Sequence, residues 1–210
     1  MTTSEARRPT VDSLGILLPA SWWTIDLRDD AARTRSVAAL VEQQIGRADV
    51  QATLRADIRR ELGQAAEQAA AAGGRLMAVS LMQADGLPLS ATLTAYRVPG
   101  ADLTGTGLTE LEGVLRDSAQ GTDVAIDLAE GARGPVLRRV TRRSGAADLG
   151  AERLSMLVAD YWLDPDDGHG LLLLTFSSPL VEARDAWLGL FDTIVASVAP
   201  AEGPRERQDA

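Results

Sequence analysis

The chain has few of the residue types on which enzymes depend. Its 210 residues include no lysine, no cysteine and no asparagine, and its single histidine is His169. Without lysine and cysteine there is no Schiff-base amine, no phosphate-loop lysine, no thiol nucleophile and no disulfide. One histidine cannot build a multi-histidine metal site. We therefore expect no cofactor and no catalytic residues, and a binding protein rather than an enzyme.

His169 belongs to the segment in which most potential metal ligands gather, residues 164–170 with the sequence DPDDGHG. Three carboxylates and an imidazole within six residues could bind a divalent cation. Gly168, however, occupies the position at which an EF-hand loop has its third acidic ligand. A turn rich in aspartate and glycine between two strands explains the segment without a metal, so we expect none.

No catalytic motif compensates for the missing residue types. The nucleophile elbow G-x-S-x-G is absent, and a triad through His169 would need a distant serine. Paired carboxylates for hydrolysis stay open, because any fold can bring distant acids together. A small-ligand-binding or hydrolytic domain that uses acidic residues is therefore the alternative to a binding protein. Convergent buried carboxylates in a cleft would favour this alternative, whereas an open apolar groove would favour the binding protein.

Five arginines lie within eleven residues of an otherwise acidic chain: Arg133, Arg138, Arg139, Arg142 and Arg143. Strand alternation places Arg138 and Arg142 on one face and Arg139 and Arg143 on the other. Two interpretations stay open. In the first, this is an edge strand whose charges prevent pairing with other sheets. In the second, Arg138 and Arg142 form a docking strip for an acidic partner, because guanidinium groups pair well with carboxylates.

Two pairs of adjacent aromatic residues are further candidates for partner binding. Trp22 and Trp23 should point to opposite faces of a strand, so we expect one of them in the core. The other is either covered by helices or exposed. Tyr161 and Trp162 pose the same question on another strand, and an exposed indole is a common anchor at protein interfaces.

Charge and hydropathy exclude several classes of partner. The formal net charge is −9 at pH 7, whereas proteins that bind nucleic acids or anionic membranes usually carry an excess of positive charge. No stretch approaches the roughly 20 apolar residues that span a bilayer, and the apolar run at 14–18 is too short for a cleavable signal, so we expect none. We expect a cytoplasmic protein with neither a nucleic-acid nor a membrane partner. The use of arginine alone as the basic residue, with abundant alanine and glycine, is typical of a GC-rich genome such as an actinobacterial one.

Hydrophobic periodicity predicts the order of the elements. Extended segments at 14–18 and 22–27 precede two long helices, one capped by Asp30 and one that is capped by Asp49 and ends at Gly73. A shorter helix carries the apolar positions from Leu108 to Ala119. Strands are expected at 76–82, 89–98, 124–128, 136–143, 154–163 and 171–177.

A final amphipathic helix is predicted after the last strand. Ser178 is its expected cap, with Pro179 at the first position, and its apolar stripe ends before Pro200. Strands, helices, hairpin-linked strands and a closing helix together predict an α+β fold, with a largely antiparallel β-sheet packed against long helices. We expect a single domain at 14–199 between flexible tails at 1–13 and 200–210.

Both ends of this pattern resemble PsbP-like (Mog-type) α+β domains. Residues 18–27, LPASWWTIDL, look like the opening strand of that family, where proline and tryptophan introduce the sheet. Residues 171–179, LLLLTFSSP, and a following helix with Trp187 and Phe191 look like its last strand and packing helix.

The resemblance implies a function in binding rather than catalysis. Members of this fold are mostly non-enzymatic and include photosystem accessory proteins, a nuclear-transport GTPase binder and bacterial chaperones for secreted effectors. Small actinobacterial proteins that look like this chain accompany type VII secretion clusters. The implied function is that of a protein-binding accessory or chaperone-like protein whose partner is a secretion substrate or secretion component. A structural homodimer without a further ligand is a third hypothesis.

Overall fold

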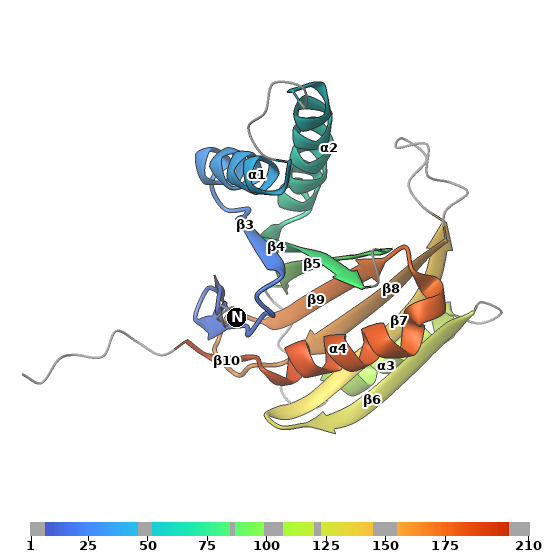
Figure 1. Cartoon of the computed structure of the whole chain (residues 1–210). Coiled ribbons are helices and arrows are strands. Elements are labelled where there is room, and N and C mark those ends of the chain that lie inside the picture. Colours follow the sequence, from blue (N-terminus) through green and yellow to red (C-terminus); the bar gives the residue numbers. More distant parts are fainter. Residues whose placement is uncertain are drawn as a thin grey trace, which may run out of the picture.

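The chain folds into an α+β structure, as predicted from the sequence (Figure 1). The structure is a computed structural model and describes residues 7–45, 52–84, 87–98, 107–119, 123–144 and 155–201. Over these residues it contains a seven-stranded sheet, a small three-stranded sheet and four α-helices. Each helix in this part of the chain is too short or too polar to cross a bilayer.

The predicted strands and helices are present with small shifts at their ends. The strands of the large sheet are β3 (Trp22–Asp26), β4 (Gly74–Ala84), β5 (Leu87–Val98), β6 (Val124–Gly131), β7 (Gly134–Ser144), β8 (Ser155–Leu163) and β9 (Leu171–Ser178). The helices are α1 (Asp30–Ile45), α2 (Ala52–Ala71), α3 (Gly107–Ser118) and α4 (Arg184–Ala196).

The large sheet has the order β3-β4-β5-β9-β8-β7-β6, and all its neighbouring strands are antiparallel. The hairpins β4–β5, β6–β7 and β8–β9 fall where turns were predicted. β9 pairs with both β5 and β8 and so joins the two groups of strands that α3 separates in sequence. The order therefore places β6 at one edge and β3 at the other.

Two predicted helix caps are wrong. The carboxylate of Asp29, rather than that of Asp30, accepts the free backbone N–H groups at the start of α1, at 2.6 Å from Ala31 and 3.2 Å from Ala32. Ser178 ends β9, and a 3₁₀ turn (Val181–Ala183) precedes α4, so the helix starts later than predicted. The predicted cap at residue 49 lies outside the described residues.

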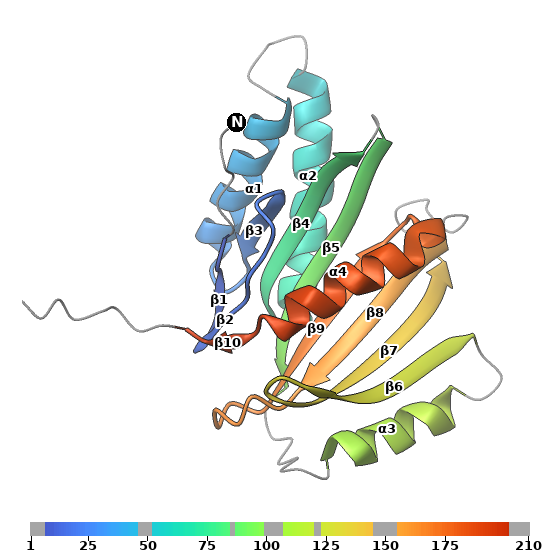
Figure 2. The same cartoon turned by 60° about the horizontal axis from the view of Figure 1, so that its bottom comes forward.

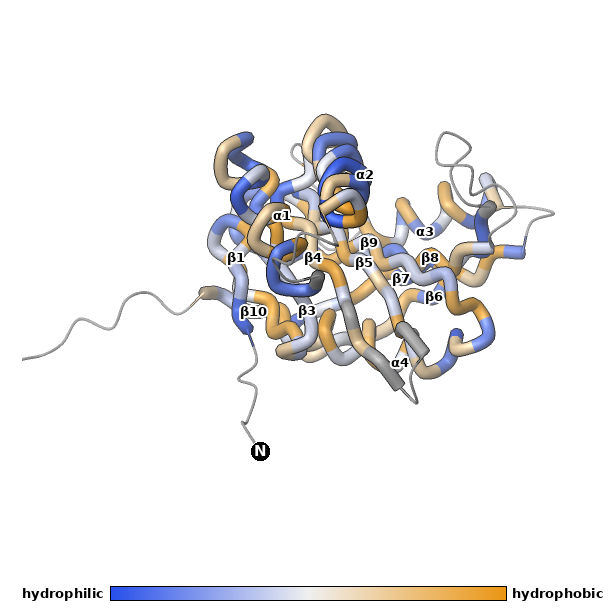
Figure 3. Tube along the Cα trace, turned by 45° about the horizontal axis from the view of Figure 1, so that its top comes forward, coloured by the Kyte–Doolittle hydropathy of each residue, from blue (hydrophilic) through white to orange (hydrophobic). Residues whose placement is uncertain are grey.

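Strand alternation gives the sheet two faces, which different helices cover (Figure 2). Leu174 and Phe176 point to the side that packs against α4, which we call the α4 face. Met77 points to the opposite face and packs with α1 and α2, while Leu137, also on that face, packs with α3. In Figure 3 hydrophobic residues are frequent along the sheet, whereas hydrophilic residues are frequent along α1 and α2.

An aromatic cluster forms the centre of the core on the α4 face. The ring of Phe176 stacks on Phe191 of α4 at 4.3 Å between centroids and meets the edges of Trp22 and Tyr161 at 6.4 and 5.6 Å. Trp187 stacks on the other side of Phe191 at 5.6 Å. These contacts join α4 to three strands, which explains why the stripe of this helix is strongly aromatic.

The predicted N-terminal tail is too long. Strands β1 (Thr10–Val11), β2 (Leu14–Gly15) and β10 (Ala199–Pro200) form the small sheet in the order β1-β2-β10. Val11 is buried, and the backbone of Arg7 pairs with that of Leu18. Residues 7–13 and 200–201 therefore belong to the domain, because their backbone bonds and apolar side chains are used in it. Residues 1–6 and 202–210 lie outside the described residues.

A buried arginine attaches these N-terminal strands to the large sheet. The guanidinium of Arg97 on β5 donates to Asp167 and, at 3.2 Å, to the carbonyl of Gly170, and its Nε lies 3.3 Å from Asp12 Oδ2. Ser13 also donates to Asp167, at 2.8 Å. We call this group, Asp12, Ser13, Arg97 and Asp167, the Arg97 clamp. The acidic loop between β8 and β9 therefore has a structural role, whereas the sequence was interpreted as a simple turn.

The clamp predicts how stability depends on pH. Burial alone would raise the pKa of Asp167, but hydrogen bonds from Ser13 and Arg97 outweigh it, and the pKa lies below its ordinary value of 3.8. A carboxylate with a lowered folded-state pKa stabilises the fold fully above about pH 4, and this contribution is lost as pH falls through the folded pKa. We expect Asp167→Asn to lower the urea midpoint at pH 7 and to flatten its decline below pH 4.

Asp166→Asn is the matched control for this measurement. Asp166 is exposed in the same loop and has a φ of 51°, which asparagine tolerates. The urea midpoint of the Asp166→Asn protein should follow that of the wild type across the pH range. If the urea midpoints of the wild type and of Asp167→Asn fall in parallel below pH 4, the carboxylate of Asp167 does not stabilise the fold as described.

Candidate functional site

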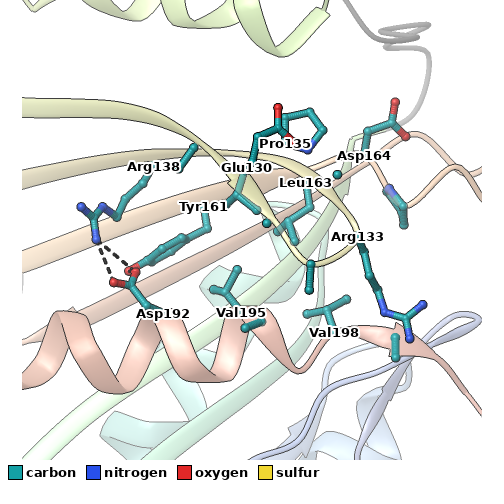
Figure 4. A pocket seen from close by; sticks show the side chains of 18 of the residues that line it. Glu130, Arg133, Pro135, Arg138, Tyr161, Leu163, Asp164, Asp192, Val195 and Val198 are labelled. Carbon is teal, nitrogen blue, oxygen red and sulfur yellow. Dashed lines mark hydrogen bonds and ion pairs between the residues drawn. The ribbon is translucent and has the colours of Figure 1, made fainter.

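A groove of about 480 Å³ opens on the α4 face, between the C-terminal half of α4 and the β6–β7 hairpin (Figure 4). Apolar side chains from β7, β8, α4 and the segment directly after α4 form its floor: Val136, Leu163, Val195 and Val198. Val195 and Val198 are buried, while Val136 and Leu163 are half-buried. A volume of this size lies in the range of ligand-binding pockets.

The groove exists because β6 has no bulky side chains on this face. Ala125, Asp127 and Ala129 occupy the alternate positions of β6 that share a face with the buried Val140 of β7, and all three are exposed. These side chains offer α4 little apolar surface, and α4 lies over β9 and β8 and leaves this face of β6 uncovered (Figure 2). The gap between α4 and the outer hairpin is the groove.

Three charged side chains cross one end of the groove. Arg138 of β7 donates from Nη1 to both oxygens of Asp192 on α4, at 3.1 and 2.9 Å. Its Nη2 donates to Asp127 of β6 at 3.1 Å. We call Asp127, Arg138 and Asp192 the Arg138 bridge. The hydroxyl of Tyr161 on β8 donates to Asp192 at 2.7 Å and helps to orient this carboxylate.

The electrostatics of the bridge favour binding over proton transfer. Burial alone would lower the pKa of Arg138, but the carboxylates of Asp127 and Asp192 outweigh it and raise the pKa. Burial, followed by the hydrogen bond to Asp192, raises the pKa of Tyr161. Both groups therefore keep their protons at neutral pH. A carboxylate that acts as a general acid needs shielding from water and cations, whereas both aspartates are about half exposed and face a guanidinium.

The arginines lie on the two faces that alternation predicted. Arg138 is in the groove, and Arg142 lies further along the same face, where it donates to Ser155 at 3.0 Å. On the opposite face Arg139 donates to Asp160 at 2.6 and 3.1 Å, and its guanidinium lies 5.3 Å from the ring centroid of Trp162.

The interpretation of this strand as an edge strand is wrong. β7 lies between β6 and β8, so its backbone is paired on both sides. The strand tolerates its arginines because a carboxylate stands directly opposite on each neighbour, Asp127 opposite Arg138 and Asp160 opposite Arg139. Arg138 already contacts two carboxylates of its own chain, and the docking strip of Arg138 and Arg142 stays a prediction.

The predicted aromatic anchors are covered. Trp22 and Tyr161 are almost fully buried in the core, and Trp162 is buried against α3. Trp23 is half-buried with α1 and α2, which agrees with the alternative in which helices cover the second indole, and the guanidinium of Arg7 lies 4.3 Å from its ring centroid. Of these four residues, Tyr161 lines the groove.

Sequence reasoning missed the residues that face Arg138. Asp127 could have been found, because it sits among alternating apolar residues of a strand in a predicted hairpin with the arginines. Asp192 interrupts the apolar stripe of the last helix, which marks it as a boundary residue. Neither signal indicates which arginine the aspartates contact, since that depends on how α4 crosses the sheet.

No protein-family model matches this chain. No curated protein matches it. Among solved structures it is similar to cyanobacterial PsbP (CyanoP) from Synechocystis sp. PCC 6803, with 15% sequence identity and a TM-score of 0.44 over 94% of this chain and 92% of that chain. The α+β class of this chain is shown by its own sheets and helices.

Proposed function

We propose that this protein is a non-enzymatic accessory or chaperone-like protein that binds an extended segment of a partner protein in the groove beside α4. The observation that carries the proposal is an apolar floor next to charges that already neutralise one another in part. Apolar floors bind side chains of a partner, while a few fixed polar groups orient it. An open apolar groove was the feature expected of a binding protein rather than of a hydrolase.

The position of the groove supports a polypeptide as its occupant. It lies beside β6, which is the edge strand of the sheet formed by the described residues. A chain can therefore enter and leave the groove across this edge, which an enclosed ligand site would not allow. Extended segments that lie along edge strands are a recurring mode of peptide recognition.

The partner class is the finer part of the same proposal. We propose that the partner is a substrate or component of a type VII secretion system. This part is supported by the resemblance of residues 18–27 and 171–179 to the PsbP-like family and by nothing else in the chain.

A small-ligand-binding protein is the second candidate, because the groove volume of about 480 Å³ also suits a small molecule. The hydrolytic form of this alternative has less support. Asp127 and Asp192 are about half exposed and bound by Arg138, and the buried Asp160 on the opposite face is bound by Arg139 and Thr175.

Blocking the groove tests both candidates. A library of random nine-residue peptides is selected on the wild-type protein, and the affinities of enriched peptides are measured by fluorescence polarisation. Ala196 is exposed and lines the groove, so Ala196→Arg should weaken binding by about tenfold or more without unfolding the protein. Ala186→Arg is the matched control, since Ala186 is exposed on α4 away from the groove and should bind as the wild type does.

The outcomes separate the candidates. Peptides that bind wild type and Ala196→Arg equally well, or no enriched peptide at all, would contradict a peptide-binding groove. Binding of the apolar dye ANS that Ala196→Arg abolishes, together with a failed peptide selection, would favour the small-ligand protein.

A further inference from the structure

A second hollow, of about 290 Å³, lies on the α4 face beside the other end of α4. Ala125 of β6, Val140 and Arg142 of β7, and Arg184 at the start of α4 contribute to its lining. The groove is lined by the same two strands and by the C-terminal half of the same helix. β6, β7 and α4 therefore line both hollows.

The strand register shows that the hollows are neighbours along one depression. Paired positions two residues apart on a strand share a face and are separated by about 7 Å, so positions four apart are separated by about 13 Å. Three successive pairs of β6 and β7 face α4: Ala125 with Val140, Asp127 with Arg138, and Ala129 with Val136. The first pair lines the second hollow, the last pair lines the groove, and the middle pair lines the end of the groove that faces the second hollow.

The middle pair belongs to the Arg138 bridge. Side-chain hydrogen bonds span the depression at this point, from Asp127 to Arg138 and from Arg138 to Asp192. Figure 4 shows the second of these contacts. The side chains of Asp127 and Asp192 are 53% and 49% exposed. Arg138 is 27% exposed and contacts both carboxylates, so it keeps one of them when a partner replaces the other, and the displaced carboxylate is solvated. The Arg138 bridge therefore separates the two hollows by side-chain contacts that a bound ligand can replace.

Charge is distributed unevenly along the depression. The groove end is lined by four carboxylates, Asp127, Glu130, Asp164 and Asp192, and two guanidinium groups, Arg133 and Arg138, a net charge of −2. The second hollow is lined by two carboxylates and two guanidinium groups and is neutral overall. A ligand that lies along the whole depression is therefore complementary if its cationic end occupies the groove.

We propose that the two hollows form one trough along β6 that binds an extended segment of about eight residues, with apolar side chains on the floor and a basic residue at the groove end. The length follows from β6, which has eight residues, because an extended ligand advances by the same rise per residue as the strand beside it. On binding, the segment displaces one carboxylate from Arg138 and passes through the bridge. This inference rests on the proposed peptide-binding function and adds the length and charge of the ligand.

Three exposed alanines allow a matched test. The nine-residue peptides selected on the wild type are measured on Ala125→Arg in the second hollow, Ala196→Arg in the groove and Ala186→Arg outside both. We expect the first two variants to weaken binding about tenfold each and the third to leave it unchanged. Selected sequences should be rich in arginine or lysine near one end, replacement of that residue by glutamate should weaken binding about tenfold, and affinity should fall as salt rises.

Failure of the trough can be told apart from failure of the groove. If Ala196→Arg weakens binding and Ala125→Arg does not, or if the four- or five-residue halves of the peptides bind as well as the whole, the trough is wrong and the groove stands. If neither variant weakens binding, or if selection yields no peptide, both proposals are wrong. Enrichment of acidic peptides, or equal binding after the glutamate replacement, would overturn the charge assignment.

Discussion

Replacing Phe191 by alanine should destabilise the protein by about 3–5 kcal/mol, as truncation of buried aromatic residues does. Phe191 has no exposed surface, and its ring lies between Phe176 at 4.3 Å and Trp187 at 5.6 Å. Its loss would leave a cavity where α4 meets the centre of the sheet. Chemical denaturation at constant temperature, followed by tryptophan fluorescence and circular dichroism, measures the change in the free energy of unfolding.

Two further variants show whether the cost comes from packing. Phe191→Leu keeps most of the volume and should cost about 1–2 kcal/mol. Val114→Ala shortens an apolar side chain that is 64% exposed on α3 and should change stability by less than about 0.5 kcal/mol. A Phe191→Ala protein as stable as the wild type would mean that α4 is not an integral part of the core.

The elements of the fold could be predicted because each depends on local periodicity. Alternating apolar residues on either side of a turn predicted β4 and β5, and the aromatic stripe predicted α4. The N-terminal strands β1 and β2 have two residues each, too few for any period to be visible. They form because Val11 and Leu14 are buried and because Arg97, more than eighty positions away, forms an ion pair with Asp12, which no local pattern contains.

The candidate site was predicted in part, for a related reason. Alternation correctly placed Arg138 and Arg142 on one face, but whether β7 is an edge strand depends on the order of all seven strands. After β5 the chain crosses to the far edge of the sheet as β6 and then returns through β7 and β8 to β9, which pairs with β5. Arg138 also meets Asp192, 54 positions away, through the path of α4 over the sheet. Long-range pairing of this kind leaves no periodic trace in the sequence.

Arg97→Met should be the most damaging charge substitution in the described residues, with a loss of about 3 kcal/mol in the free energy of unfolding. The Arg97 side chain is 3% exposed, and Asp12 and Asp167 both face it. Methionine fills a similar volume but leaves the two carboxylates without a cation and close to each other. Because Asp12 is the N-terminal part of the clamp, we also expect faster hydrogen exchange at the amides of Ile16 and Leu18, which bond to residues 9 and 7.

An exposed ion pair supplies the control for this prediction. Arg28→Met removes a bidentate contact to Asp26, but the two side chains are 47% and 37% exposed, so water replaces the lost partner and the change should stay below about 1 kcal/mol. Adding Asp167→Asn to Arg97→Met should recover part of the lost stability, because it removes one of the unpaired charges. If Arg97→Met and Arg28→Met cost the same, and exchange at Ile16 and Leu18 is unchanged, the N-terminal strands are held by their apolar side chains alone.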